Sequence, residues 1–150
     1  MGWYEIGKAS VAAATGAAYQ TYAGATTTDA ELAEIAAFCN AATASSFSIA
    51  RPANTPVATG TAVFNAMNPD SAVAALSTWA GTWSTAPTTP TVIFRMITLP
   101  ATIGAGYVAV WPYGFGLRMS KTAGSTQWVV LWNFGAGTGS VLNTYARVTE

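Results

Sequence analysis

Six carboxylates and one thiol are the side chains of this chain that could carry acid–base or nucleophilic chemistry, because its 150 residues include no histidine. The carboxylates are Asp29, Glu31 and Glu34 in one short segment, Glu150 at the end of the sequence, and Glu5 and Asp70. A glycosidase needs two carboxylates across one bond, and no spacing places Glu5 beside Asp70. Without histidine, the usual general base and the imidazole metal ligand are both missing.

Neither the cysteine nor the glycine-rich segments add a convincing site. Cys39 follows the apolar run 35–38, which favours a buried small hydrophobe over a reactive thiol. One cysteine and no D-x-D-x-D-G loop give no support to a zinc or calcium site. The segment Gly135–Gly139 joins two predicted strands, so we expect a hairpin turn there in preference to a phosphate-binding loop. We therefore expect no enzymatic activity, no cofactor and no metal.

The composition points to protein partners. The chain is 51% hydrophobic and 8% charged, against roughly 25% charged residues in typical globular domains. Its net charge is zero, so self-repulsion would not keep copies apart. Six basic residues balanced by six acids make no stripe for direct nucleic-acid binding. The longest apolar runs are far shorter than the ~20 residues of a membrane-spanning helix. We expect much of the surface to be covered by other protein.

Charge is divided unevenly along the chain. Residues 1–50 carry one basic residue, Lys8, against four acids, which gives a net charge of −3. Residues 51–150 carry five basic residues against two acids, which gives +3. Either the acidic N-terminal region pairs with a basic patch on its own body or on a neighbour, or the charges are scattered and solvated.

Two helices and an extended arm are predicted from local patterns. Thr28 and Glu31 form a capping box, and apolar residues follow at helical spacing, which predicts a helix at about 29–40. The Ala-rich segment 70–79 is a candidate second short helix. Residues 1–24 mix aromatics with Gly and Thr, which is poor for helix and favours an extended arm.

After residue 41, turn signals recur every ten to fifteen residues, which is typical of an all-β sandwich or barrel. We predict strands at 46–51, 62–67, 91–99, 107–112, 116–121, 127–134 and 140–149, and a loop at 81–90. The predicted fold class is mainly β, a jelly-roll-like β-sandwich with one or two short helices and an N-terminal arm, because closing two sheets on one core leaves few exposed edges. The domain division is an arm at 1–24 and a single domain at 25–150.

The predicted strand at 127–134 is too apolar for a sheet with one wet face. Trp128, Val130 and Trp132 point one way while Val129 and Leu131 point the other. The strand at 91–99 is similar, with only Arg95 as an interruption. One face of such strands packs in the sandwich, and we expect the other to contact a neighbouring subunit of a homo-oligomer.

Aromatic residues offer an alternative. Most of them lie in predicted strands, where core packing or subunit contact is the simpler interpretation. Trp83, in the predicted polar loop, and Tyr113, between Pro112 and Gly114, are candidates for contact with a glycan.

Three stretches resemble small virion proteins of tailed bacteriophages. They are TTPTVIFRMITLPATIGAGYVAVWP (88–112), WVVLWNFGAGTGSVLNTYARVTE (128–150) and RPANTPVATGTAV (51–63), and the similarity covers roughly residues 45–150. The resemblance implies a jelly-roll capsid decoration, or cement, protein. It also implies a homotrimer that binds the major capsid protein on the outer surface of the virion after synthesis in the host cytoplasm. These motifs are turns and strands, so they transfer no active site.

The resemblance and the double apolar faces together suggest which residues contact the capsid or another subunit. The candidates are Trp3, Tyr4, Arg51, Arg95, Val129, Leu131 and Arg147. In this interpretation Trp3 and Tyr4 belong to an arm that tethers the protein. The alternative function is a carbohydrate- or receptor-binding tip module of a phage particle, with Trp83 and Tyr113 as its contacts.

Overall fold

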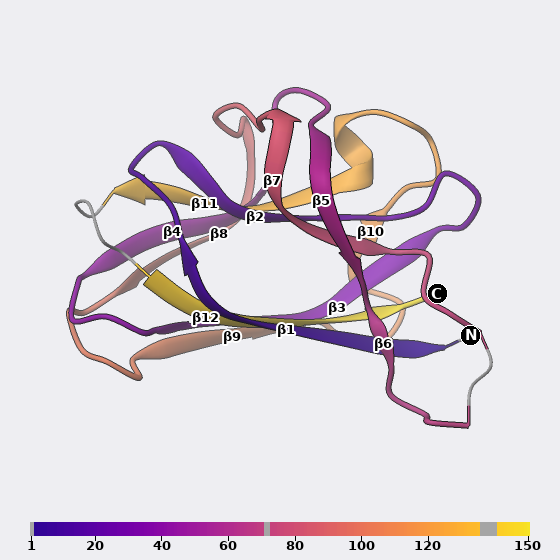
Figure 1. Ribbon diagram of the computed structural model, residues 1–150, viewed down its shortest axis with the longest axis horizontal. Coiled ribbons are helices and arrows are strands. Elements are labelled where there is room, and N and C mark those ends of the chain that lie inside the picture. The colour runs from indigo at the N-terminus through magenta and orange to yellow at the C-terminus, as the bar shows by residue number, and fades with distance from the viewer. Residues whose placement is uncertain (1, 71–72, 136–140) are drawn as a thin grey trace.

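The computed structural model describes residues 2–70, 73–135 and 141–150, which form two antiparallel sheets stacked as a sandwich (Figure 1). Sheet A contains β1 (Trp3–Ala12), β3 (Ala30–Cys39), β6 (Asn65–Ala66), β9 (Gly106–Val110), β10 (Leu117–Met119) and β12 (Val141–Thr149). Sheet B contains β2 (Ala17–Ala23), β4 (Ser45–Arg51), β5 (Val57–Val63), β7 (Thr78–Thr85), β8 (Val92–Leu99) and β11 (Trp128–Gly135). A 3-10 turn, η1 (Ser125–Gln127), leads into β11.

The strand order is that of a jelly roll. Sheet A runs β9-β3-β12-β1 and sheet B runs β8-β4-β11-β2. The chain crosses between sheets at each step from β1 to β4, and it crosses again from β8 to β9 and from β11 to β12. Strands β5, β6 and β7 are inserted between β4 and β8, and they extend the edges opposite β8 and β9. The predicted jelly-roll-like sandwich is therefore confirmed.

The core lies between the two sheets and is built by alternation along each strand. Its largest fully buried apolar side chains are Tyr19, Tyr22, Leu32, Ile35, Phe47, Ile49, Met119, Val129, Leu131 and Leu142. Buried Phe64 lies between β5 and β6 and contacts the ring of Tyr22 at a centroid separation of 6.0 Å. The predicted strand at 62–67 is therefore two shorter strands, one in each sheet, joined by a residue that fills the core.

The predicted helix at 29–40 is wrong, because residues 30–39 form strand β3 in the middle of sheet A. A β-bulge explains the error. Glu34 pairs with Arg147 and Leu32 with Val148, which leaves Ala33 as an extra residue. The bulge gives the inward-facing Leu32 and Ile35 a spacing of three residues in place of two, so the strand imitates a helical period. Pairing with β12 on one side and with β9 and β10 on the other outweighs the local helix signal.

The predicted N-terminal arm is also wrong. Residues 3–12 and 17–23 form β1 and β2, which lie inside sheets A and B. The backbone N–H of Gly2 donates to the carbonyl of Glu150 at 2.8 Å, so the start of the chain pairs with its end. Tyr4 is buried in the core. The extended conformation was foreseen, but a detached arm is excluded by this pairing.

Strand β7 contradicts parts of two predictions, the helix at 70–79 and the loop at 81–90. Residues 78–85 pair with β2 and β5, so much of the predicted loop at 81–90 is strand. Within the predicted helix at 70–79, residues 71–72 lie outside the described residues, and 73–77 have no regular structure. The backbone N–H groups of Leu76 and Ser77 donate to the carboxylate of Glu150 at 2.8 and 2.6 Å, which holds this segment extended.

The other predicted strands are confirmed to within a few residues. They correspond to β4, β8, β9, β10, β11 and β12. Most of the predicted hairpin turn at Gly135–Gly139 lies outside the described residues. However, β11 belongs to sheet B and β12 to sheet A, so the connection between them is not a β-hairpin.

Candidate functional site

The outer face of sheet B is covered by the chain itself at β11. Val130 and Trp132 form a small buried cluster with Ala18 and Ala50, and the half-buried rings of Trp83 and Phe134 pack against it. The indole N–H of Trp83 donates to Oγ1 of buried Thr21 at 3.0 Å, which fixes this cover. The second apolar face of β11 therefore needs no neighbouring subunit.

Val129 and Leu131 are not contact residues. Both are fully buried between the sheets in the main core. The prediction that this pair contacts the capsid or another subunit is wrong, because both side chains face the opposite sheet.

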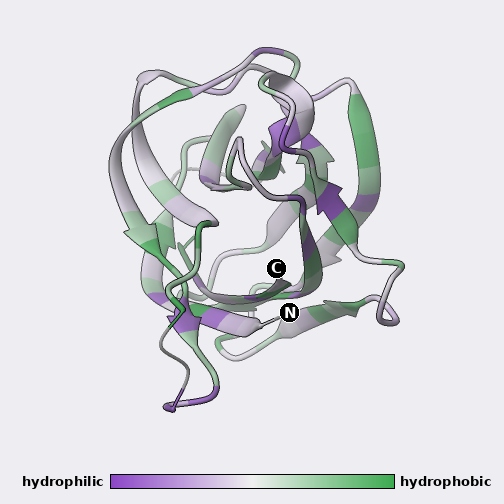
Figure 2. Cartoon of the chain, turned by 90° about the vertical axis from the view of Figure 1, so that its right-hand side faces the viewer, coloured by the Kyte–Doolittle hydropathy of each residue, from purple (hydrophilic) through white to green (hydrophobic). Residues whose placement is uncertain are grey.

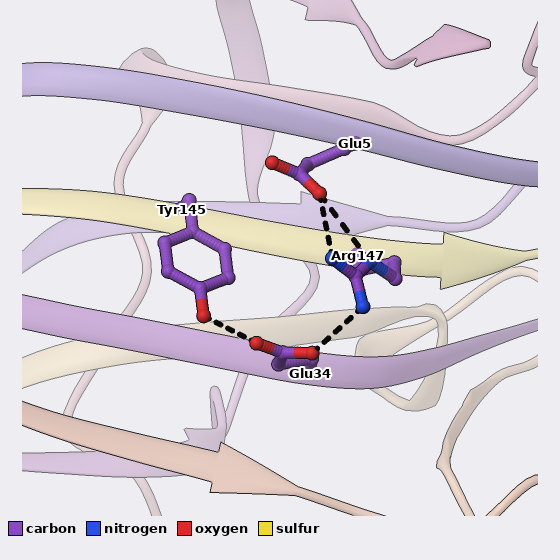
Figure 3. Close-up of polar contacts among 4 residues, drawn as sticks. All are labelled: Glu5, Glu34, Tyr145 and Arg147. Atoms are coloured by element: carbon purple, nitrogen blue, oxygen red, sulfur yellow. Dashed lines mark hydrogen bonds and ion pairs between the residues drawn. The ribbon is translucent and has the colours of Figure 1, made fainter. Parts of the chain in front are cut away.

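A charged cluster spans three strands on the outer face of sheet A (Figure 3). Arg147 of β12 lies between Glu5 of β1 and Glu34 of β3. Its Nη2 and Nε donate to Oε2 of Glu5 at 3.0 and 3.3 Å, and its Nη1 donates to Oε2 of Glu34 at 3.0 Å. The hydroxyl of Tyr145, two residues earlier on β12, donates to Oε1 of Glu34. This arrangement ties the three central strands of the sheet together.

The electrostatics of the cluster follow from these contacts. The hydrogen bond to the Glu34 carboxylate raises the pKa of Tyr145 to about 12, so its phenol keeps its proton at neutral pH. The hydrogen bond to Glu5 raises the pKa of Arg147 above its usual value. One cation is shared by two carboxylates, which is the arrangement of an ion-pair brace and differs from a paired proton donor and acceptor.

The uneven charge distribution is explained by pairing within the chain. The ion pairs found among the described residues join an acid from the first fifty residues to an arginine near the C-terminus: Glu5 and Glu34 with Arg147, and Asp29 with Arg118. Three of the four acids of residues 1–50 thus pair with arginines of the same chain, although the predicted acidic helix is a strand. Glu5 is paired with Arg147 and shares that arginine with Glu34, whereas no contact joins its side chain to that of Asp70.

Arg51, at the end of β4, forms hydrogen bonds with three backbone carbonyl groups elsewhere in the chain. Its Nη1 donates to the carbonyls of Thr126 and Trp128 at 2.7 and 2.8 Å, and its Nη2 donates to the carbonyl of Arg118. Burial lowers the pKa of Arg51. The guanidinium thus joins β4 to the chain that leads into β11 and to β10, which leaves few donors for an external partner.

The sandwich side where both sheets end in β8 and β9 carries exposed apolar side chains. Within the part of the chain that the structure describes, β8 pairs only with β4, and β9 only with β3. We call this region the β8–β9 side. Its exposed large apolar residues are Val92, Ile93 and Met96 of β8, Ile103 of the connecting segment, and Val108 and Val110 of β9, and they lie beside exposed Arg95, Thr98 and Thr102. Arg95 is the only charged residue of this set. Figure 2 shows that strongly hydrophilic segments are short and scattered among the described residues.

The remaining predicted site residues are dispersed. Trp3 is 42% exposed and its ring lies 6.3 Å from that of exposed Tyr113. Arg95 is exposed on β8, whereas Trp83 packs on the outer cluster of sheet B. The structure therefore does not bring Trp83 and Tyr113 together as one platform. Sequence reasoning missed the brace of Glu34 and Tyr145, although Tyr145 and Arg147 stand two residues apart, which is the spacing of one strand face.

No family model, no curated protein and no solved structure matches this chain. Among the described residues, no group of three or more His, Cys, Asp or Glu side chains is placed to hold a metal ion. The same residues include no helix with the length and apolarity to cross a bilayer.

Proposed function

We propose that this chain is a structural protein that assembles through its β8–β9 side, and that it serves as a decoration, or cement, protein on the outer surface of a phage head. The observation that carries the proposal is the pair of adjoining edge strands with exposed aliphatic side chains and one charge. The jelly-roll order and the low charge content fit the same role, as does the resemblance of residues 45–150 to small virion proteins.

Exposed edge strands explain why this surface calls for a partner. An edge presents unpaired backbone groups, which monomeric proteins protect with charges, prolines or a covering segment. Here β8 has one charge, Arg95, and β9 has none. Val110 is 65% exposed and Met96 is 52% exposed. Such side chains are characteristic of interface cores, where charged residues are depleted.

The free energy of association indicates how large the contact must be. Burying six half-exposed aliphatic side chains yields about 1 kcal/mol each, or about 6 kcal/mol per subunit. Association costs on the order of 4–15 kcal/mol in lost freedom. The aliphatic residues alone reach the lower end of that range, so the contact must include the strand edges or neighbouring loops.

The partners are other copies of the chain, as a homotrimer, and the major capsid protein. In a cyclic trimer each contact joins two different surfaces, so the β8–β9 side of one copy meets another surface of the next. The protein is then made in the host cytoplasm, is carried on the virion, and acts without catalysis.

The test is the mass in solution of the wild type and of two matched variants, Val110→Glu and Val63→Glu. Val63 is 55% exposed on β5, at the opposite edge of the sandwich. A buried carboxylate at position 110 should weaken self-association at least about tenfold, whereas Val63→Glu should do so only if the opposite edge is the surface that the β8–β9 side meets. A wild-type monomer at micromolar concentration, or dissociation by Val63→Glu alone, would overturn the assignment to the β8–β9 side.

The capsid role is tested separately on particles. Virions purified from cells that make this protein should carry it at a fixed copy number, and the Val110→Glu variant should show reduced occupancy. Absence of the chain from purified particles would refute the decoration role while leaving self-association intact.

A further inference from the structure

A cleft lies between the two sheets, at some distance in the fold from the β8–β9 side. Its volume is about 450 Å³, within the roughly 300–1,000 Å³ of small-molecule sites. Residues 8–12 of β1 form one wall, and residues 60–62 of β5 with Trp79, Gly81 and Thr82 of β7 form the other. The lining includes two aromatic residues, Trp79 and the buried Tyr19, and one charged side chain, Lys8.

Trp79 is held in a fixed orientation. Its indole N–H donates to Oε1 of Gln20 at 2.9 Å, and Gln20 is fully buried. A Cβ atom at position 81 would lie 2.7 Å from the indole ring, so the ring can occupy this position because residue 81 is glycine. Trp79 is half-buried, and it borders the cleft as a preorganised flat surface.

Lys8 lies over this ring without an acidic partner. Its Nζ is 4.3 Å from the centre of the Trp79 ring. Among the residues that the structure describes, Lys8 forms no ion pair, and no Asp or Glu lines the cleft. A cation–π contact at a solvent-accessible site is weak, so a ligand can displace the ammonium group from the ring and pair with it.

The wall formed by β1 is shaped by a β-bulge. Lys8 pairs with Thr144 and Val11 with Leu142, so one residue is extra. Ser10 adopts a φ of 54°, which is rare for a residue with a side chain. Its N–H donates to Oδ1 of Asn143 at 3.0 Å, and its Oγ accepts a hydrogen bond from Asn40 at 2.9 Å. Backbone strain maintained by such contacts is concentrated at ligand sites.

We propose that this cleft binds a carbohydrate that carries a carboxylate, such as a glycan with a sialic or uronic acid. A pyranose ring stacks its apolar face on Trp79, and the hydroxyl group of Thr82 at the opposite wall binds a sugar hydroxyl. Lys8 pairs with the carboxylate. Stacking and hydroxyl pairing serve a neutral sugar equally, so Lys8 confers the preference for an acidic one.

The first experiment is a glycan array that contains sialylated and uronic-acid glycans beside their neutral counterparts. It is followed by NMR titration of the full chain with D-glucuronate and D-glucose. We expect acidic glycans to be preferred and the indole N–H signal of Trp79 to shift with glucuronate. Absence of binding to every acidic glycan, or equal binding of neutral and acidic ones, would overturn the proposal.

Matched variants locate the site. Lys8→Gln should weaken glucuronate binding about tenfold and leave glucose binding unchanged, whereas Lys121→Gln, at the chain's other lysine, should change neither. Trp79→Phe should weaken both sugars, and Trp83→Phe, on the outer face of sheet B, neither. Loss of binding in the Trp83 or Lys121 variant would place the ligand elsewhere. Lys8→Gln should keep the wild-type mass in solution, so a failure here is distinguishable from a failure of the proposed assembly.

Discussion

Replacing Gln20 by leucine should destabilise the fold more than a typical point substitution. Gln20 is fully buried on β2, and its amide connects both sheets. Its Oε1 accepts hydrogen bonds from Nε1 of Trp79 at 2.9 Å and from Oγ1 of Thr144 at 3.0 Å, and its Nε2 donates to the hydroxyl of Tyr22. Leucine has a similar size and none of these groups, so three polar partners lose a contact.

The cost follows from how well each partner is buried. A buried polar group without a partner costs about 1–3 kcal/mol. Tyr22 and Thr144 are buried and also share a side-chain hydrogen bond, so each bears the lower part of this cost, about 1–2 kcal/mol. Trp79 borders the cleft, where water can replace the amide. The apolar surface gained with leucine returns about 1 kcal/mol. We therefore expect a net loss of about 1–3 kcal/mol in the free energy of unfolding.

Urea unfolding at a single protein concentration measures this loss. With a slope of about 1–3 kcal/mol per molar urea, the midpoint should fall by about 1 M without a change of slope. The control is the double variant Gln20→Leu with Tyr22→Phe. Removing both partners leaves neither unpaired, so the double variant should cost less than the sum of the single ones. A Gln20→Leu midpoint equal to that of the wild type, or strictly additive costs, would refute the reasoning.

Two further predictions concern the sheet A brace and the N-terminal strands. The pKa of Tyr145 is raised to about 12 from 10.0 by Glu34, so its stabilising contribution is complete below about pH 10 and is lost as the pH rises through 12. Urea midpoints of the wild type should therefore fall more steeply over this range than those of Tyr145→Phe, and parallel profiles would contradict this. Deletion of residues 1–24 removes β1 and β2, so circular dichroism should show loss of the native fold, whereas a folded truncated protein would support a detached arm.

The sequence was sufficient to predict the fold class and most strands after residue 41, because their patterns of apolar residues and turns are local. The helix at 29–40 failed for a physical reason. The bulge at Ala33 converts a period of two into a spacing of three between Leu32 and Ile35. The capping-box pattern at Thr28 added a second false signal, since Asp29 in fact accepts a hydrogen bond from the backbone N–H of Lys121 at 3.0 Å.

The candidate site was less predictable than the fold. The alternation of side chains along a strand shows which residues share a face of the sheet, but it does not show which face is buried. For β11 the two faces are both apolar, so the sequence alone does not decide between Trp128 with Trp132 and Val129 with Leu131 as the inner face. The smaller Val129 and Leu131 occupy it, because the space between the sheets is already filled by residues such as Tyr19, Tyr22 and Phe47. Which face fits is decided by the opposite sheet, which no single strand encodes.

The irregular positions of the strands also create the features that distinguish this sandwich. Thr61 pairs with Ala80 and Gly60 with Thr82, so Gly81 is an extra residue in β7. The β5–β7 pairing has two further register shifts, but the extra residue at Gly81 is the one within β7 between the two tryptophans. It reverses the alternation, and Trp79 therefore points inward to Gln20 while Trp83 points outward to Thr21. In a regular strand both rings would lie on one face, and either the outer cluster of sheet B would lose its cover or the cleft would lose its platform. Gly81 therefore affects both the packing on the outer face of sheet B and the shape of the cleft. The cleft lies beside this bulge and the bulge in β1, where regular strand pairing is interrupted.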